Sequence, residues 1–190
     1  MKNKALSIIY DEHRALGAVV HALLYFSERV AEGREPNYKL LWTMIRYIAE
    51  FPQTLHHPKE ETFIFAPLAK RTHAGDDVLG ELRLQHHDDL DLIAAIREAL
   101  GDLEGGAPDG AQRFHAAVGK FAELTWKHMR IEEDVLIPLA DRHLTEDDWQ
   151  EISDAFGANV DPRFGKDTSG HFQRMFDDIV KLAPAPIGLA

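Results

Sequence analysis

The sequence predicts an all-α protein, an up-down-up-down antiparallel four-helix bundle with additional C-terminal helices. Apolar residues recur at helical spacing along most of the chain, and no segment shows the strict alternation of a half-buried strand. Breaks rich in glycine, proline and aspartate separate four segments of roughly 25 residues, and short connections between long helices favour antiparallel neighbours. The chain of 190 residues is long enough to bury a core without disulfides.

Each expected helix has recognisable ends. The first ends at Gly33 with Pro36 beyond it, and Gly75 with two following aspartates opens the third. The segment Glu-Gly-Gly-Ala-Pro-Asp-Gly at 104–110 is the clearest break in the chain. We therefore expect helices over residues 4–31, 37–71 and 75–101, and a fourth from the 104–110 loop to residue 143.

Residues 144–190 are expected to form a helical appendage packed on a bundle of residues 1–143. Thr145 precedes three acidic residues, which is the pattern of an N-cap followed by a negatively charged first turn. The expected appendage contains a short helix to Phe156, a turn at 161–165, an amphipathic helix over 170–182 and a loose tail. This appendage can also serve as an oligomer contact.

The composition excludes several classes of protein. The chain has no cysteine, which removes disulfides, thiolate metal sites and cysteine nucleophiles, and suits a cytoplasmic location. A formal net charge of −11 disfavours nucleic-acid binding. No apolar stretch approaches the roughly 20 residues needed to span a membrane. Eleven histidines in an acidic chain without cysteine suit metal ions that prefer nitrogen and oxygen ligands, such as iron, manganese or zinc.

A His-x-x-x-Glu motif occurs twice in matching context. The first runs from His57 to Glu61 and the second from His128 to Glu132, and in both a proline follows six residues after the glutamate. Residues four apart lie on the same face of a helix, so each motif presents an imidazole and a carboxylate together. Two such half-sites that face each other across a bundle can hold a pair of metal ions.

Helical-wheel positions add one inward histidine from each of the other two helices. On the first helix His13 lies on the apolar stripe, whereas His21 lies at its edge. On the third helix His86 shares the stripe, and His87 points away from it. We therefore expect His13 and His86 to face the bundle interior.

The fourth helix gives the strongest signal for a metal site. His128 and Glu132 both lie on a regular apolar stripe, where a carboxylate is costly unless it is paired or ligates a metal. A single motif of this kind is usually a solvated ion pair. Four inward imidazoles and two inward carboxylates would carry a large burial cost without a metal, so together they predict a metal site.

The phase of the second helix is ambiguous. His56 and Glu60 have the same spacing as His57 and Glu61, and the apolar stripe upstream points almost opposite to His57. The comparison of the two motif copies selects His57 and Glu61. This choice requires a phase slip, such as a π-bulge or a kink, between residues 51 and 58, where two prolines remove helix hydrogen bonds.

The order of these residues resembles the hemerythrin-like (HHE cation-binding) family over roughly residues 5–143, and in its longer bacterial form also the C-terminal helices. The apolar residues and the proline after each motif are part of the resemblance. It implies a four-helix bundle with two non-haem iron ions, joined by an oxo or hydroxo bridge and by two glutamates; zinc or manganese are alternative metals. Transferred by position, the ligands are His13, His57, Glu61, His86, His128 and Glu132.

The chain departs from the oxygen-carrying hemerythrins of invertebrates at two positions. Those proteins have a second histidine four residues after the histidine of the third helix, where this chain has Leu90. They also have an aspartate five residues after the histidine of the fourth helix, where this chain has Glu132 at four and Glu133 at five. The resemblance then implies six protein ligands and open coordination positions, which favours reactivity with small oxidants over reversible oxygen carriage.

We therefore expect a cytoplasmic non-haem di-iron protein, monomeric or homodimeric, that binds or reacts with O₂, NO or peroxide in sensing or in stress defence. The alternative is an iron storage, iron delivery or metal-sensing module without catalysis. No nucleic-acid or membrane partner is expected. The residues alone do not decide between a catalytic, a sensory and a storage role.

Overall fold

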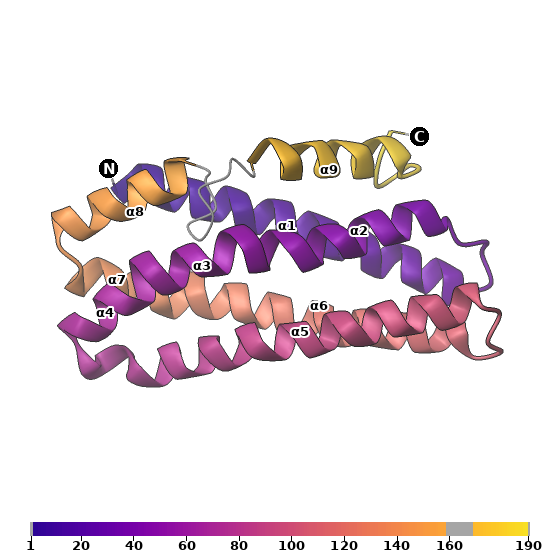
Figure 1. Cartoon of the computed structure of the whole chain (residues 1–190), viewed down its shortest axis with the longest axis horizontal. Coiled ribbons are helices and arrows are strands. Elements are labelled where there is room, and N and C mark those ends of the chain that lie inside the picture. The colour runs from indigo at the N-terminus through magenta and orange to yellow at the C-terminus, as the bar shows by residue number, and fades with distance from the viewer. Residues whose placement is uncertain (1, 159–168, 190) are drawn as a thin grey trace.

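Four long helical segments form the body of the protein. The computed structural model describes residues 2–158 and 169–189, and every regular element in this part of the chain is a helix. The segments begin with α1 (Lys2–Ala31), α2 (Tyr38–Phe51), α5 (Asp76–Glu104) and α6 (Gly110–Ile131). They lie side by side along the long axis of the molecule (Figure 1), and both α1 and α5 pack against α2 and α6. The prediction of an all-α fold is confirmed.

The second and fourth segments are interrupted by π turns. After α2 come the π turn η1 (Pro52–His56), α3 (His57–Glu60), the π turn η2 (Glu61–Phe65) and α4 (Ala66–Arg71). After α6 come the π turn η4 (Glu132–Leu136) and α7 (Ile137–His143). A π turn adds about one residue to a helical turn and shifts the phase of everything that follows. The slip expected between residues 51 and 58 is therefore present as η1.

The helix ends follow their local chemistry. The side chain of Asn37 caps α2 by accepting a hydrogen bond from the amide of Leu40 at 3.1 Å. The 3₁₀ turn η3 (His73–Gly75) leads into α5. The expected end of α5 at Gly101 is three residues early, because the chain leaves the helix only where Gly106 adopts a φ of 80°, which favours glycine.

The C-terminal helices α8 (Glu146–Ala158) and α9 (Ser169–Leu182) lie on one side of the bundle (Figure 1). α8 packs mainly on α1, and α9 packs mainly on α2. The turn expected at 161–165 lies outside the described residues. The tail was expected to be loose, but residues 183–189 fold back on α9, with Ala183 buried and the amide of Leu189 donating to the carbonyl of Val180 at 3.0 Å.

The apolar core has two parts, and a band of polar residues lies between them. The larger part contains side chains such as Val20, Ile48, Ile96 and Phe114. The smaller part lies toward α8 and contains side chains such as Ile9, Phe65, Leu82 and Leu136. In each long segment the stretch between these two parts carries the histidines and glutamates considered below. No helix in the described ranges is long and apolar enough to cross a membrane.

Candidate metal centre

Two glutamates occupy the centre of the polar band. Glu60 ends α3 and Glu132 begins η4, and each is 1% exposed. Both oxygens of Glu132, one oxygen of Glu60 and the Nε2 atoms of His86 and His128 have no hydrogen-bond partner within the part of the chain that the structure describes. Buried polar atoms are normally satisfied, and an unpaired buried carboxylate is especially costly. A cation bound among these atoms would satisfy them.

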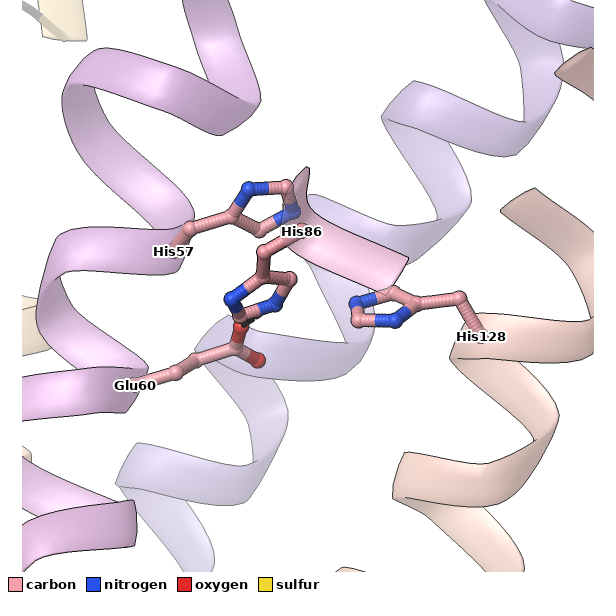
Figure 2. Close-up of side chains that lie close together, drawn as sticks. All are labelled: His57, Glu60, His86 and His128. Atoms are coloured by element: carbon pink, nitrogen blue, oxygen red, sulfur yellow. Dashed lines mark ion pairs between the residues drawn. The ribbon is translucent and has the colours of Figure 1, made fainter. Parts of the chain in front are cut away.

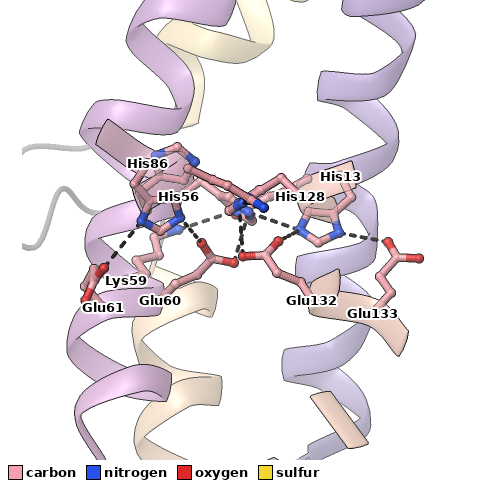
Figure 3. Close-up of polar contacts among 12 residues, drawn as sticks. His13, His56, Lys59, Glu60, Glu61, His86, His128, Glu132 and Glu133 are labelled. Carbon is pink, nitrogen blue, oxygen red and sulfur yellow. Dashed lines mark hydrogen bonds and ion pairs between the residues drawn. The ribbon is translucent and has the colours of Figure 1, made fainter. Parts of the chain in front are cut away.

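Four imidazoles surround the two carboxylates, one from each long segment, and each directs its Nε2 toward a carboxylate oxygen (Figure 3). Because neither carboxylate is paired with a cationic lysine or arginine, these imidazoles are its principal polar neighbours within the described ranges. The Nε2–oxygen distances are 3.2 Å for His13 to Glu132, 3.2 Å for His56 to Glu60, 3.7 Å for His86 to Glu60 and 3.1 Å for His128 to Glu132.

A fifth imidazole, that of His57, lies over the ring of His86 (Figure 2). The two rings are stacked, with 3.8 Å between their centroids. Two overlapping groups of side chains therefore offer ligand atoms within 4.8 Å of one another: His57, Glu60, His86 and His128 in one, and His13, His56, Glu60 and Glu132 in the other. Glu60 belongs to both groups, which suits a carboxylate that bridges two ions.

Hydrogen bonds at the outer nitrogens orient three of these rings. His13 Nδ1 contacts Glu133 Oε1 at 2.8 Å, and His56 Nδ1 contacts Glu12 Oε2 at 2.8 Å. His128 Nδ1 contacts the side-chain oxygen of Gln85 at 3.0 Å. An oxygen acceptor places the imidazole proton on Nδ1 and leaves the Nε2 lone pair free to ligate a metal, as is usual for metal-binding histidines.

Burial and mutual charge shift the pKa values in this cluster. Burial and the nearby charge of Glu132 raise the pKa of Glu60. For Glu132 burial acts in the same direction, but the imidazoles of His128 and His13 outweigh it and hold its pKa well below the ordinary value. Burial and the charge of His128 lower the pKa of His86 to about 3, so His86 is neutral at pH 7, the form in which an imidazole binds a metal.

A buried lysine supports the outer side of the cluster. Lys59 is fully buried on α3, and its Nζ lies 3.2 Å from Glu12 Oε1 and 4.9 Å from the ring centroid of Phe156 on α8. Glu12 thus accepts hydrogen bonds from both Lys59 and His56. Burial opposes charge on Glu12, but these two partners outweigh it and lower its pKa. The carboxylate that orients His56 is therefore held in its charged form.

The structure brings together five of the six residues expected as ligands, and it leaves Glu61 outside the cluster. Glu61 is 36% exposed at the edge of the bundle, where one oxygen lies 3.0 Å from Arg83 Nε and the other 3.4 Å from His86 Nδ1. Glu60 takes the central place expected for Glu61. His56, which the comparison of the motif copies set aside, faces the cluster beside His57.

The π turn η1 explains this difference. One π turn delays the helical phase by about one residue, which turns His56 and Glu60 inward. A larger slip is needed to bring His57 and Glu61 to the same place. The apolar stripe upstream already favoured His56 and Glu60, because its helical phase is closer to theirs than to that of His57 and Glu61.

Among the other histidines, His21 and His87 lie outside the cluster, as their helical-wheel positions predict. His21, His87, His73 and His143 are exposed, and His171 and His115 are partly buried. The Nδ1 of His115 lies 3.0 Å from the hydroxyl of Ser27, far along the bundle from the cluster. Leu90, one turn after His86, is 49% exposed and contributes nothing to the cluster.

A small cavity lies beside the cluster. Its volume is about 20 Å³, and its lining includes the imidazoles of His57, His86 and His128 and the apolar side chains of Leu16, Phe121 and Leu124. This volume admits the centre of one water-sized molecule. A larger cavity of about 480 Å³ lies between α1, α2 and the tail, and none of the clustered residues lines it.

A comparison of the sequence with known families agrees with the cluster. Residues 4–140 match the hemerythrin HHE cation binding domain, a range that includes every clustered histidine and glutamate. A comparison with curated proteins finds no match to the chain. Since the family match covers well over half of the 190 residues, the chain belongs to the hemerythrin HHE cation-binding family.

Proposed function

We propose that the chain binds a pair of metal ions, iron in the first place, and that the pair binds or reacts with O₂, NO or peroxide. The observation that carries the proposal is the buried set of unpartnered glutamate oxygens and imidazole nitrogens between the two parts of the core. His13 and His56 would hold one ion, His86 and His128 the other, and Glu60 and Glu132 both. Nitrogen and oxygen ligands without sulfur suit iron, manganese or zinc.

The ligand set supports two ions rather than one. The two glutamates contribute four oxygens at the centre, and the surrounding ligand atoms fall into two groups, one with His13 and His56 and the other with His86 and His128. Each of the two groups of side chains suffices for an ion with three or four protein ligands. We read the surrounding helices as an up-down-up-down bundle, the architecture in which facing helices supply such sites.

The cavity supports a small ligand. Its volume of about 20 Å³ favours a molecule of a few heavy atoms, and the apolar side chains of Leu16, Phe121 and Leu124 in its lining suit a molecule with little charge. When bound, iron supplies redox chemistry, and the protein contributes ligands, an apolar pocket and limited access. The size and the wall together favour O₂, NO or peroxide, in sensing or in defence against oxidants.

The test is to load the protein with Fe(II) under anaerobic conditions, measure iron per chain, and then add O₂, NO or peroxide separately. We expect two iron ions per chain and a new near-ultraviolet absorption band with at least one of the three. Iron binding without any spectral response or turnover would favour the storage or delivery alternative. Failure to bind two ions would contradict the proposal itself.

Two glutamine substitutions make a matched pair for this experiment. Glu60→Gln removes a central carboxylate charge, and Glu61→Gln removes the charge next to it at the edge of the bundle. We expect Glu60→Gln to lose iron and Glu61→Gln to keep two ions. The opposite pattern would show that the ligand is Glu61.

A further inference from the structure

His57 differs from the other four clustered imidazoles in its contacts. Each of the others has its Nε2 between 3.1 and 3.7 Å from an oxygen of Glu60 or Glu132. His57 has no contact within 4.0 Å to either carboxylate in the described structure, although it lies within 4.8 Å of Glu60. Its ring instead stacks on His86 (Figure 2).

The hydrogen bonds around Gln53 give His57 the opposite tautomer from its neighbours. Gln53 Nε2 donates to Asp89 Oδ2 at 3.1 Å, and the same nitrogen lies 3.5 Å from His57 Nδ1. An ionised carboxylate only accepts hydrogen bonds, so Asp89 fixes the amide group with its nitrogen toward His57. His57 Nδ1 then faces a donor, which favours the tautomer with the ring proton on Nε2. A neutral imidazole with its proton on Nε2 has no lone pair there for a metal.

Two of these three residues, His57 and Asp89, contribute polar groups to the lining of the small cavity. Leu16 and Phe121 also line it. Asp89 is only 7% exposed. Its carboxyl group is therefore buried inside the bundle, next to the cluster of histidines and glutamates. A donor in this lining would meet a small molecule at the point where it approaches the ion held by His86 and His128.

We propose that His57 is a hydrogen-bond donor to the small ligand of the site, and that Gln53 and Asp89 position it for this role. The proposal rests on the metal pair described above and reverses the expectation that His57 is a ligand. The ligand class is a molecule of two or three heavy atoms that accepts a hydrogen bond, such as a peroxide, with azide as its stable probe. His57 then favours such acceptors over ligands that make no hydrogen bond.

The test separates a metal ligand from a donor by measuring metal content. His57→Leu removes the imidazole, and His86→Leu is the matched change in the ring stacked on it. After loading with Zn(II) or Fe(II), we expect two ions per chain in the wild type and in His57→Leu, and fewer in His86→Leu. Optical titration of the iron-loaded protein is expected to show azide binding about tenfold weaker in His57→Leu, the equivalent of about 1.4 kcal/mol.

Each result has a definite consequence. Loss of an ion from His57→Leu would overturn the proposal and leave the metal pair standing, whereas a wild type without two ions would remove the metal pair as well. Unchanged azide affinity in His57→Leu would also overturn the donor role. A second variant, His57→Gln, keeps a hydrogen-bond donor in its side-chain amide. It replaces His57→Leu in both measurements if the leucine variant does not fold. It is expected to hold two ions and to recover most of the azide affinity, and loss of an ion from it would overturn the proposal.

Discussion

Glu60 offers the sharpest perturbation because it belongs to both groups of potential ligands. Replacing it with glutamine is expected to weaken the binding of both ions at once. His13→Gln, in contrast, removes a potential ligand from only one group. A ligand that binds the folded state at 100 times its Kd stabilises by about 2.7 kcal/mol, so two ions contribute about 5 kcal/mol. For a chain of this size that is a rise in Tm of roughly 10–20 °C.

Differential scanning calorimetry with and without Zn(II) measures these shifts directly. We expect the full metal-induced rise in Tm in the wild type and in Glu61→Gln. We expect about half of this rise in His13→Gln and almost none in Glu60→Gln. Glu60→Gln should also raise the Tm of the protein before metal is added, because it removes the charge of a buried carboxylate, one oxygen of which has no hydrogen-bond partner. A full metal-induced rise in Glu60→Gln would refute the assignment of Glu60 as a shared ligand.

Three further predictions concern the stability of the fold. Lys59→Met is expected to cost about 3–5 kcal/mol in urea denaturation because it leaves Glu12 buried without its cation, and adding Glu12→Gln should recover much of this; no recovery would contradict the pairing. Phe114→Ala, deep in the larger core, is expected to cost about 3–5 kcal/mol without changing the metal content, and loss of metal from a folded variant would argue against separate roles. Asp148→Asn is expected to cost up to about 1 kcal/mol at pH 7. The hydrogen bond from Arg71 lowers the pKa of Asp148 to about 2, so this stability is present above about pH 4 and disappears as the pH falls toward 2. A difference between wild type and Asp148→Asn that is constant from pH 7 to 2 would contradict that account.

Helical periodicity predicts the all-α fold and the inward orientation of most of the clustered residues. His13, His86 and His128 lie within uninterrupted α-helices, and Glu132 directly follows α6, so 3.6 residues per turn holds from the upstream apolar stripe to each of them. Their inward orientation therefore follows from the sequence. The same rule placed His87 and His21 outside the cluster, where the structure has them.

The choice between Glu60 and Glu61 depended on the size of the phase slip in the second helical segment. The two prolines near His57 predicted a phase slip, but not whether it amounts to one residue or two. The structure has a slip of about one residue at η1, and this decides between Glu60 and Glu61. The proton position on His57 depends on Asp89, a residue 32 positions away whose contact with Gln53 no local pattern encodes.

The contacts of Glu12 and Glu133 were also beyond sequence reasoning. Each carboxylate orients a histidine on a different long segment, over separations of 44 and 120 residues. Acidic residues on a helix are commonly solvated, so nothing in the sequence distinguishes these two from their neighbours. Because outer partners of metal-binding histidines typically affect affinity by about 10–100-fold, they matter to the site nearly as much as the ligands.

Anomalous X-ray diffraction from crystals of the iron-loaded protein tests the central claim most directly. The account predicts two iron peaks between Glu60 and Glu132, one beside His13 and His56 and the other beside His86 and His128, with Glu61 away from both. A single peak, or two peaks that do not share Glu60, would contradict it.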